Sequence, residues 1–132
     1  MTTNASPATT RARTSALALV GDVVVVLAFA GTGREFHSEG NPILGVLLTA
    51  WPFLEGLLVA WALPPIRRRP LRVWPGGVAV WLGTYVIGMI LRGATGAGLA
   101  VPFLIVAATV LGVAFLGWRA VAWLIRRAVR RA

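Results

Sequence analysis

The sequence predicts an all-α membrane protein, a bundle of four transmembrane helices with both termini in the cytoplasm. Hydrophobic residues make up 58% of the 132 positions, whereas a soluble domain has about 45–50% even when glycine is counted. They gather in four long stretches, each near or above the roughly 17–25 apolar residues that cross the hydrocarbon core of a bilayer. The predicted spans cover about residues 16–32, 43–63, 76–91 and 99–124.

The arginines predict how the bundle is oriented. The formal net charge is +9, and all 13 basic residues are arginines. Two precede the first span, four lie at 67–72 and four at 126–131, whereas the first and third connections hold one each. Because basic residues collect on the cytoplasmic side, both termini and the second connection are predicted to face the cytoplasm. Abundant Ala, Gly, Val and Arg without Lys are typical of a GC-rich bacterial genome.

Helix boundaries follow from asparagine and proline. Asn41 can cap the free N–H groups of the second span, and Pro42 loses nothing at the first helical position. Pro64 and Pro65 end that span. Pro75 opens the third span, as Pro42 opens the second. The sequence thus predicts a flexible cytoplasmic tail (1–14), a four-helix transmembrane domain (15–125) and a basic cytoplasmic tail (126–132).

Two alternatives of organisation stay open. The first span resembles a signal peptide, because Ala28-Phe29-Ala30 before Gly31 fits an A-x-A cleavage site. Asp22 within the apolar region is unusual for a signal, so retention of the span is favoured. The ends of spans one and three also look alike, and each is followed by a span with a Pro-Phe pair, which would fit a two-plus-two internal duplication.

The six tryptophans divide by predicted depth. Four near the cytoplasmic ends are expected in an interfacial belt, where indole rings rest between acyl tails and headgroups. Two lie deeper and are expected to pack inside the bundle. The belt comprises Trp61, Trp74, Trp118 and Trp123, and the packed pair Trp51 and Trp81.

Ionisable residues within a span cost about 2.5–3.5 kcal/mol on insertion scales and are functional hypotheses by default. Asp22 lies about two turns in from the cytoplasmic end of the first span, and Arg119 lies at a similar depth on the fourth, which runs the opposite way. We expect a structural ion pair that joins these helices. A proton- or cation-responsive carboxylate is the alternative.

Glu55 lies near the middle of the second span, three residues after Pro52. That proline leaves the Leu48 carbonyl without its usual donor, so the carboxyl and this exposed backbone would suit a cation or a proton relay. The structural alternative is a neutral carboxyl, which desolvation favours, hydrogen-bonded to a hydroxyl at comparable depth. The candidate partners are Thr84, Tyr85 and Thr109.

A second candidate site lies on the predicted outer face, where Arg34, Glu35, His37, Glu39 and Arg92 gather. Both arginines end outward-running helices, and cations are favoured at helix C-termini. Capping combined with salt bridges to the glutamates is the structural interpretation. The functional one is an external anion or pH-sensing site that uses both arginines and His37.

Several classes of chemistry are excluded by the composition. The sequence has no cysteine and a single histidine, so disulfides, thiol catalysis and histidine metal clusters are absent. No cofactor or metal is expected. The positive charge flanks apolar spans, which argues against a nucleic-acid partner. Asp22, Glu55 and His37 lie at three different depths and cannot easily converge, so enzymatic activity is not expected.

Several sequence blocks occur in a recognisable order. They are Asp22 with residues 29–34, residues 37–40, residues 49–53, residues 80–81 with 88–92, and residues 102–107. Over residues 16–124 this pattern resembles the domain of unknown function 3054 family, small membrane proteins common in actinobacteria. The resemblance implies four spans and a bacterial inner membrane, and it implies no catalytic residues.

The sequence therefore favours an accessory, scaffold or self-assembling membrane component. Its expected partners are the lipid bilayer and either further copies of itself or other membrane subunits. The alternative is a small oligomeric channel or transporter for ions, protons or a solute, which would use the intramembrane carboxylates.

Overall fold

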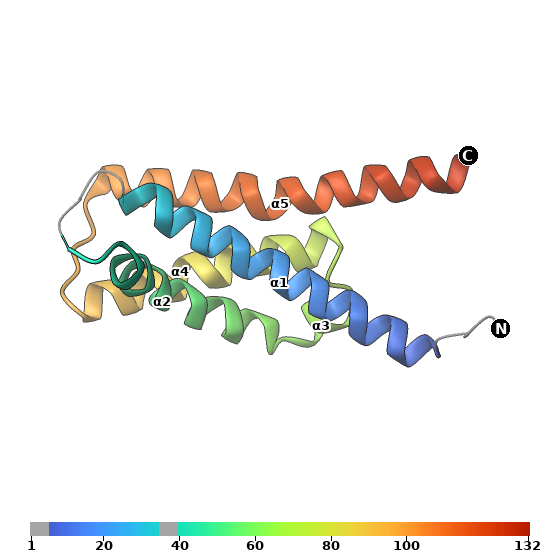
Figure 1. Cartoon of the computed structure of the whole chain (residues 1–132), viewed down its shortest axis with the longest axis horizontal. Helices are drawn as coiled ribbons and strands as arrows, with labels where there is room; N and C mark the ends of the chain where they lie inside the picture. Colours follow the sequence, from blue (N-terminus) through green and yellow to red (C-terminus); the bar gives the residue numbers. More distant parts are fainter. Residues whose placement is uncertain (1–5, 35–39) are drawn as a thin grey trace.

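The computed structural model describes residues 6–34 and 40–132. Within these residues, four helical segments are long and apolar enough to cross a membrane, and no strand occurs. The N- and C-termini lie at the same end of the elongated molecule (Figure 1). The elements are α1 (Pro7–Arg34), α2 (Pro42–Trp61), α3 (Pro64–Arg68), the turn η1 (Val73–Gly77), α4 (Val78–Ala94) and α5 (Val101–Arg131).

The first helix begins earlier than the sequence predicted. Residues 7–14 were expected to belong to a flexible tail, but α1 is helical from Pro7. The Ser6 hydroxyl accepts a hydrogen bond from the backbone N–H of Thr9 at 3.2 Å, and proline is well suited to the first helical position. A capped start followed by Thr, Ala and Arg is therefore enough to extend the helix beyond the apolar span.

The predicted start of the second span is confirmed. The Asn41 side-chain oxygen accepts from the backbone N–H groups of Ile43 at 3.0 Å and Leu44 at 3.4 Å. Pro52 interrupts the helix at its middle. In Figure 1 the first turns of α2 are seen nearly end-on, whereas its second half runs beside α4. A proline kink of this kind is expected, because the ring removes one backbone hydrogen bond.

The second half of α2 and α4 form the closest helix pair, because small residues face each other. A Cβ added to Gly56 would lie 2.9 Å from the Thr84 carbonyl oxygen, and one added to Gly83 would lie 2.9 Å from the Ala60 Cβ. Gly56 and Ala60 are one turn apart and form a small-xxx-small pair, the arrangement that brings membrane helices into backbone contact. The Phe53 ring fills the space left by Gly88 in the same way.

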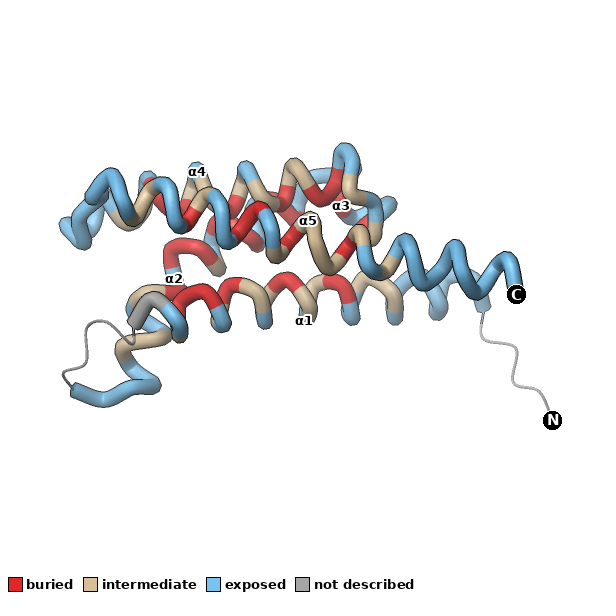
Figure 2. The backbone as a smooth tube through the Cα atoms, turned by 90° about the horizontal axis from the view of Figure 1, so that it is seen from above, coloured by how far each residue is buried: buried red, intermediate tan, exposed pale blue. Residues whose placement is uncertain are grey.

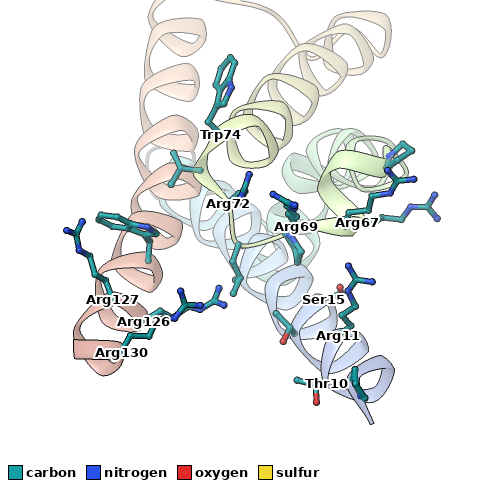
Figure 3. A pocket seen from close by; sticks show the side chains of 18 of the residues that line it. Thr10, Arg11, Ser15, Arg67, Arg69, Arg72, Trp74, Arg126, Arg127 and Arg130 are labelled. Carbon is teal, nitrogen blue, oxygen red and sulfur yellow. The ribbon is translucent and has the colours of Figure 1, made fainter. Parts of the chain in front are cut away.

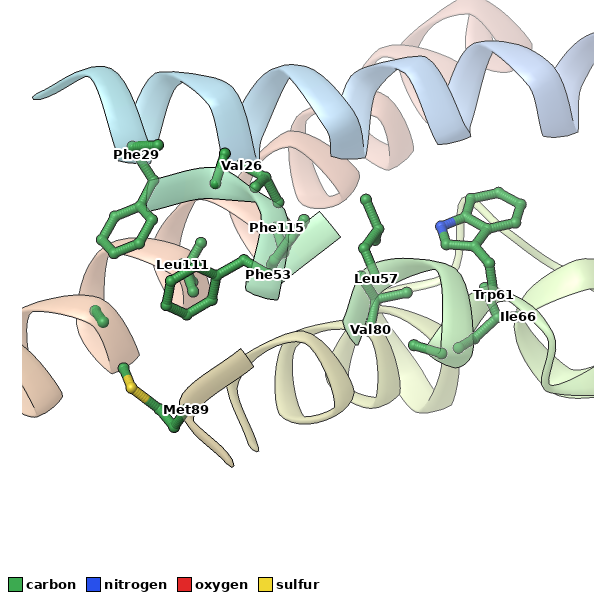
Figure 4. Packing of buried hydrophobic residues seen from close by; sticks show 14 of the residues in the cluster. Val26, Phe29, Phe53, Leu57, Trp61, Ile66, Val80, Met89, Leu111 and Phe115 are labelled. Carbon is green, nitrogen blue, oxygen red and sulfur yellow. The ribbon is translucent and has the colours of Figure 1, made fainter. Parts of the chain in front are cut away.

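The core is apolar and occupies the middle of the bundle (Figure 4). Phe29 meets Phe53 edge to face, with ring centroids 5.3 Å apart. Leu57, Leu111 and Phe115 are fully buried around them. The outward faces are also apolar, and Figure 2 shows how exposed residues alternate with the buried ones that face neighbouring helices. A surface of this composition is stable in lipid, since acyl chains are as apolar as leucine.

Two helices extend beyond the others at the end that holds both termini. α1 has 28 residues and α5 has 31, so at 1.5 Å per residue they are about 42 and 46 Å long. The hydrocarbon core of a bilayer is only about 30 Å thick. The last turns of α5 are exposed on all sides (Figure 2), so both helices have charged ends that extend past the apolar zone.

Candidate functional site

The most concentrated polar chemistry in the described residues surrounds Asp22, which α1 places in the interior with no exposed surface. Arg119 of α5 forms two parallel hydrogen bonds to the carboxylate, from Nη1 to Oδ1 at 2.8 Å and from Nη2 to Oδ2 at 2.7 Å. The indole of Trp118 donates to Oδ1 and that of Trp61 to Oδ2, each at 2.9 Å. One carboxylate therefore joins α1, α2 and α5.

The guanidinium of Arg119 is held as tightly as the carboxylate. Its Nε donates to the carbonyl oxygen of Pro70 at 2.9 Å, in the connection between α3 and η1, and its Nη1 also reaches the Phe115 carbonyl at 3.3 Å. The Trp118 ring lies under the guanidinium carbon at 4.5 Å from its centroid. Gly77 leaves room for the side chain, because a Cβ there would lie 2.9 Å from Arg119 Cδ.

This arrangement suits a structural ion pair. Tryptophan and arginine can only donate hydrogen bonds, so all four donors complement the negative carboxylate. Each oxygen of Asp22 already accepts twice, and every nitrogen of Arg119 is used. The fork-to-fork contact is the strongest geometry for such a pair. The ion pair expected from the sequence is therefore present, and it leaves no free atom for a proton or cation.

Glu55 is not part of this network. Its side chain is exposed on the outer side of α2, facing away from the bundle. Tyr85 instead donates to the Leu104 carbonyl at 3.0 Å, and Thr109 donates to the Ile105 carbonyl of its own helix at 2.9 Å. Among the described residues, none hydrogen-bonds to or forms an ion pair with the Glu55 carboxyl.

Of the six intramembrane candidates, the structure thus brings together only Asp22 and Arg119. The hydroxyls expected to bind Glu55 are committed elsewhere, apart from that of Thr84. The Thr84 hydroxyl is buried and has no hydrogen-bond partner in the described part of the chain. It lies where α4 meets Gly56, whereas the side chain of Glu55 is exposed.

Only one member of the outer cluster can be described. Arg92 donates from Nε to the Gly98 carbonyl at 3.0 Å and from Nη2 to the Ala97 carbonyl at 3.2 Å. Its guanidinium also lies 4.2 Å from the centre of the Phe103 ring. Arg92 therefore ties the turn between α4 and α5 to the helix end. The side chain of Arg34 and residues 35–39, with His37 and Glu39, lie outside the described residues.

The tryptophans are where sequence reasoning missed the site. Trp61 and Trp118 were expected in the interfacial belt, but both bind Asp22, since an indole N–H at the depth of a buried carboxylate finds its partner there. Their predicted depth, which matches that of Asp22 and Arg119, was the available signal. Trp51, expected inside the bundle, is 38% exposed. The others fall as predicted: Trp74 and Trp123 are exposed, and Trp81 packs inward and donates to the Ala108 carbonyl at 2.9 Å.

Four apolar helices around a buried ion pair define a multi-pass α-helical membrane protein. The chain belongs to the family described as "protein of unknown function (DUF3054)", whose model matches residues 19–122. The match includes Asp22, Glu55 and Arg119, and it ends before the basic end of α5. No curated protein and no solved structure matches the chain.

Proposed function

We propose that this protein is a self-assembling structural component of the bacterial plasma membrane, without enzymatic activity, whose copies pack through the exposed side of α2. The observation that carries the proposal is the position of Glu55. The side chain is exposed on the outside of a membrane helix and has no partner within the described chain. Lipid tails offer a carboxyl group no hydrogen bond, whereas a second protein can.

The depth of Glu55 makes this argument strong. Its neighbour Gly56 contacts Thr84, which lies near the middle of the apolar segment Val73–Ala94. An acidic residue at the centre of a span costs about 2.5–3.5 kcal/mol on insertion scales. A contact between copies that provides a hydrogen bond in the membrane recovers part of that cost.

A second copy of the same chain is the partner that best fits this face. Trp51 lies one turn before Glu55, is exposed, and its indole N–H has no hydrogen-bond partner in the described residues. The face therefore carries one unused donor and one unused acceptor next to each other. In an interface with two-fold symmetry each patch meets its own copy, so the Trp51 of one copy comes close to the Glu55 of the other.

The saturated state of Asp22 supports the structural part of the proposal. A catalytic carboxylate needs an accessible oxygen within reach of a substrate, and both oxygens of Asp22 are occupied. The Tyr85 and Thr109 hydroxyls serve backbone carbonyls. Asp22 therefore joins α1 to α2 and α5, and Tyr85 joins α4 to α5.

The test is the oligomeric state in liposomes at decreasing protein-to-lipid ratio, measured by single-molecule photobleaching of a dye-labelled chain. We expect wild type to self-associate and Glu55→Leu to weaken association roughly tenfold, since interhelical hydrogen bonds in bilayers contribute about 0.6–2 kcal/mol. Glu55→Gln keeps a polar group, so its self-association should be weaker than that of wild type and stronger than that of Glu55→Leu.

Thr109→Val is the matched control, because Thr109 is a polar, exposed residue on α5 whose hydroxyl bonds its own helix. It should associate like wild type. A wild-type chain that is monomeric at every ratio, or a Glu55→Leu variant that associates fully, would overturn the proposal.

A second candidate function, an oligomeric channel or transporter, draws on the same residue. If copies meet at α2, the Glu55 carboxyls lie between them and could line a path for protons or small cations. Proton flux into proteoliposomes separates the two functions. Equal, negligible flux for wild type and Glu55→Gln excludes conduction, whereas flux that falls in Glu55→Gln favours it over a purely structural role.

A further inference from the structure

The end of the bundle that holds both termini contains a hollow of about 1550 Å³ (Figure 3). Three segments far apart in the sequence form its walls: the first turns of α1, the stretch from α3 to η1, and the last turns of α5. In Figure 3, Arg126 and Arg130 lie on the side of α5 turned toward α1, and Arg11 reaches from α1 toward the α3 segment.

The charged side chains that line this hollow are all positive. Among the described residues, nine arginines line it, one from α1, four from residues 67–72 and four from residues 126–131, and no described acidic residue is part of the lining. The two described acids lie elsewhere, since Asp22 is bound to Arg119 and Glu55 lies in α2. Nine guanidinium groups around one space repel each other unless an anion lies between them.

We propose that this hollow binds the phosphate-bearing headgroup of an anionic phospholipid. Arginine presents a planar fork that bonds two phosphate oxygens at once. Basic pockets between membrane helices are suited to headgroups that carry one or more phosphates. The walls also include Leu71, Val73 and the exposed indole of Trp74, so an apolar border adjoins the charged space. A lipid needs both, since its acyl chains continue from its headgroup into the bilayer.

The position of the hollow favours a lipid over a soluble phosphate compound. The helical ends that form its walls extend beyond the length needed to cross the hydrocarbon core, which places the arginines at headgroup level. Orientation by the positive-inside rule requires only basic residues near the span ends. It does not require that three separate segments place their arginines around one space.

The test is binding to detergent-purified protein, measured by native mass spectrometry after removal of endogenous lipid. The probes are phosphatidylglycerol and cardiolipin, with phosphatidylcholine as the neutral lipid and inorganic phosphate and ATP as soluble phosphates. We expect saturable binding of the anionic lipids, tighter for cardiolipin because it carries two phosphates. Arg69→Gln, Arg126→Gln and Arg130→Gln should each weaken it about fivefold, because one basic residue near the surface contributes about 1 kcal/mol.

Arg13→Gln is the matched control, because Arg13 lies on the same exposed end of α1 but does not line the hollow. It removes the same charge and should leave lipid affinity within twofold of wild type. All four arginines are exposed, and an unchanged circular dichroism spectrum of each variant verifies folding. Equal weakening by Arg13→Gln, binding of phosphatidylcholine with the same affinity, or saturable binding of the soluble phosphates alone would each overturn the lipid site.

Discussion

Asp22 and Arg119 show how a membrane protein can contain two charges that lipid alone could not accommodate. Each cancels the charge of the other, and the hydrogen bonds from Trp61, Trp118 and to the Pro70 carbonyl satisfy their remaining atoms. A buried pair of this kind adds little net stability relative to apolar residues of similar volume. Removing one partner is costly, because the other charge is then left buried and unpaired.

We therefore expect Asp22→Asn to destabilise the bundle by about 3–5 kcal/mol. The amide would lose the negative charge that Arg119 needs and would direct its own NH₂ group at N–H donors. The double variant Asp22→Asn with Arg119→Gln should be more stable than Asp22→Asn alone. The measurement is the thermal unfolding midpoint in detergent, followed by circular dichroism. An Asp22→Asn midpoint equal to wild type would contradict the structural role.

The sequence was sufficient to pair Asp22 with Arg119, because depth along two antiparallel spans can be counted residue by residue. It was not sufficient to say where Glu55 points. A helix in lipid is apolar on its inner and outer faces alike, so hydrophobic periodicity does not distinguish them. The direction became known from the structure, in which Glu55 is exposed while its neighbour Gly56 packs against α4.

At the scale of the elements, backbone contact between α2 and α4 is the main feature that the sequence did not reveal. The glycines within span three (Gly83 and Gly88) and within span four (Gly112 and Gly117) are five residues apart, so neither pair has GxxxG spacing. The structure instead places Gly56 and Ala60 of α2 against Gly83 of α4. Small residues mark a close contact only when the partner helix is known, since many helices carry glycines with open space around them. The start of α2, by contrast, was predictable because a cap is a local interaction.

Gly56→Ala should destabilise the bundle, because its new methyl group would meet the Thr84 carbonyl oxygen at 2.9 Å and the Gly83 carbonyl oxygen at 3.1 Å. Both are backbone atoms that cannot rotate away, and overpacking of this kind costs about 1–3 kcal/mol. Gly117→Ala on α5 is the matched control, since nothing lies within 4 Å of its added Cβ. That variant should be neutral or gain up to about 1 kcal/mol from helix propensity. Thermal midpoints of the two variants in one detergent give the comparison, and equal effects would contradict the close contact.

At the scale of the whole molecule, the four spans bring the start of α1 and the end of α5 to one end (Figure 1), where nine arginines line the hollow. The number of spans was predictable because bilayer thickness sets a minimum length for each apolar stretch. The length of the helical extensions was not, since residues 7–14 and 126–131 carry no apolar signal and become helical as continuations of α1 and α5. The hollow could not be predicted from the sequence either, because the helical extensions of α1 and α5 form two of its walls.

We expect the arginine-rich end to face the cytoplasm and α1 to be retained in the mature protein. Cleavage after Ala30 would remove Asp22 and leave Arg119 buried without its partner. A fluorescent or phosphatase reporter fused after Ala132 should report a cytoplasmic location, and one inserted in the turn at Gly96 should report the opposite side. The intact mass of the purified chain should be that of a chain that contains residues 7–30. A periplasmic C-terminus, or a mass that lacks α1, would show this orientation and retention to be wrong.

The separation of Asp22 from Arg119 along the chain has a consequence for biosynthesis. The carboxylate emerges from the ribosome 97 residues before the guanidinium that neutralises it, so the first helix enters the bilayer with an unmatched charge. Before the last helix arrives, the indole of Trp61 in α2 can donate a hydrogen bond to that carboxylate but cannot neutralise its charge. The ion pair that closes the bundle therefore forms only after the final span is complete. A chain truncated before Arg119 keeps an unpaired carboxylate in its first helix, and we expect such a chain to be recognised and degraded.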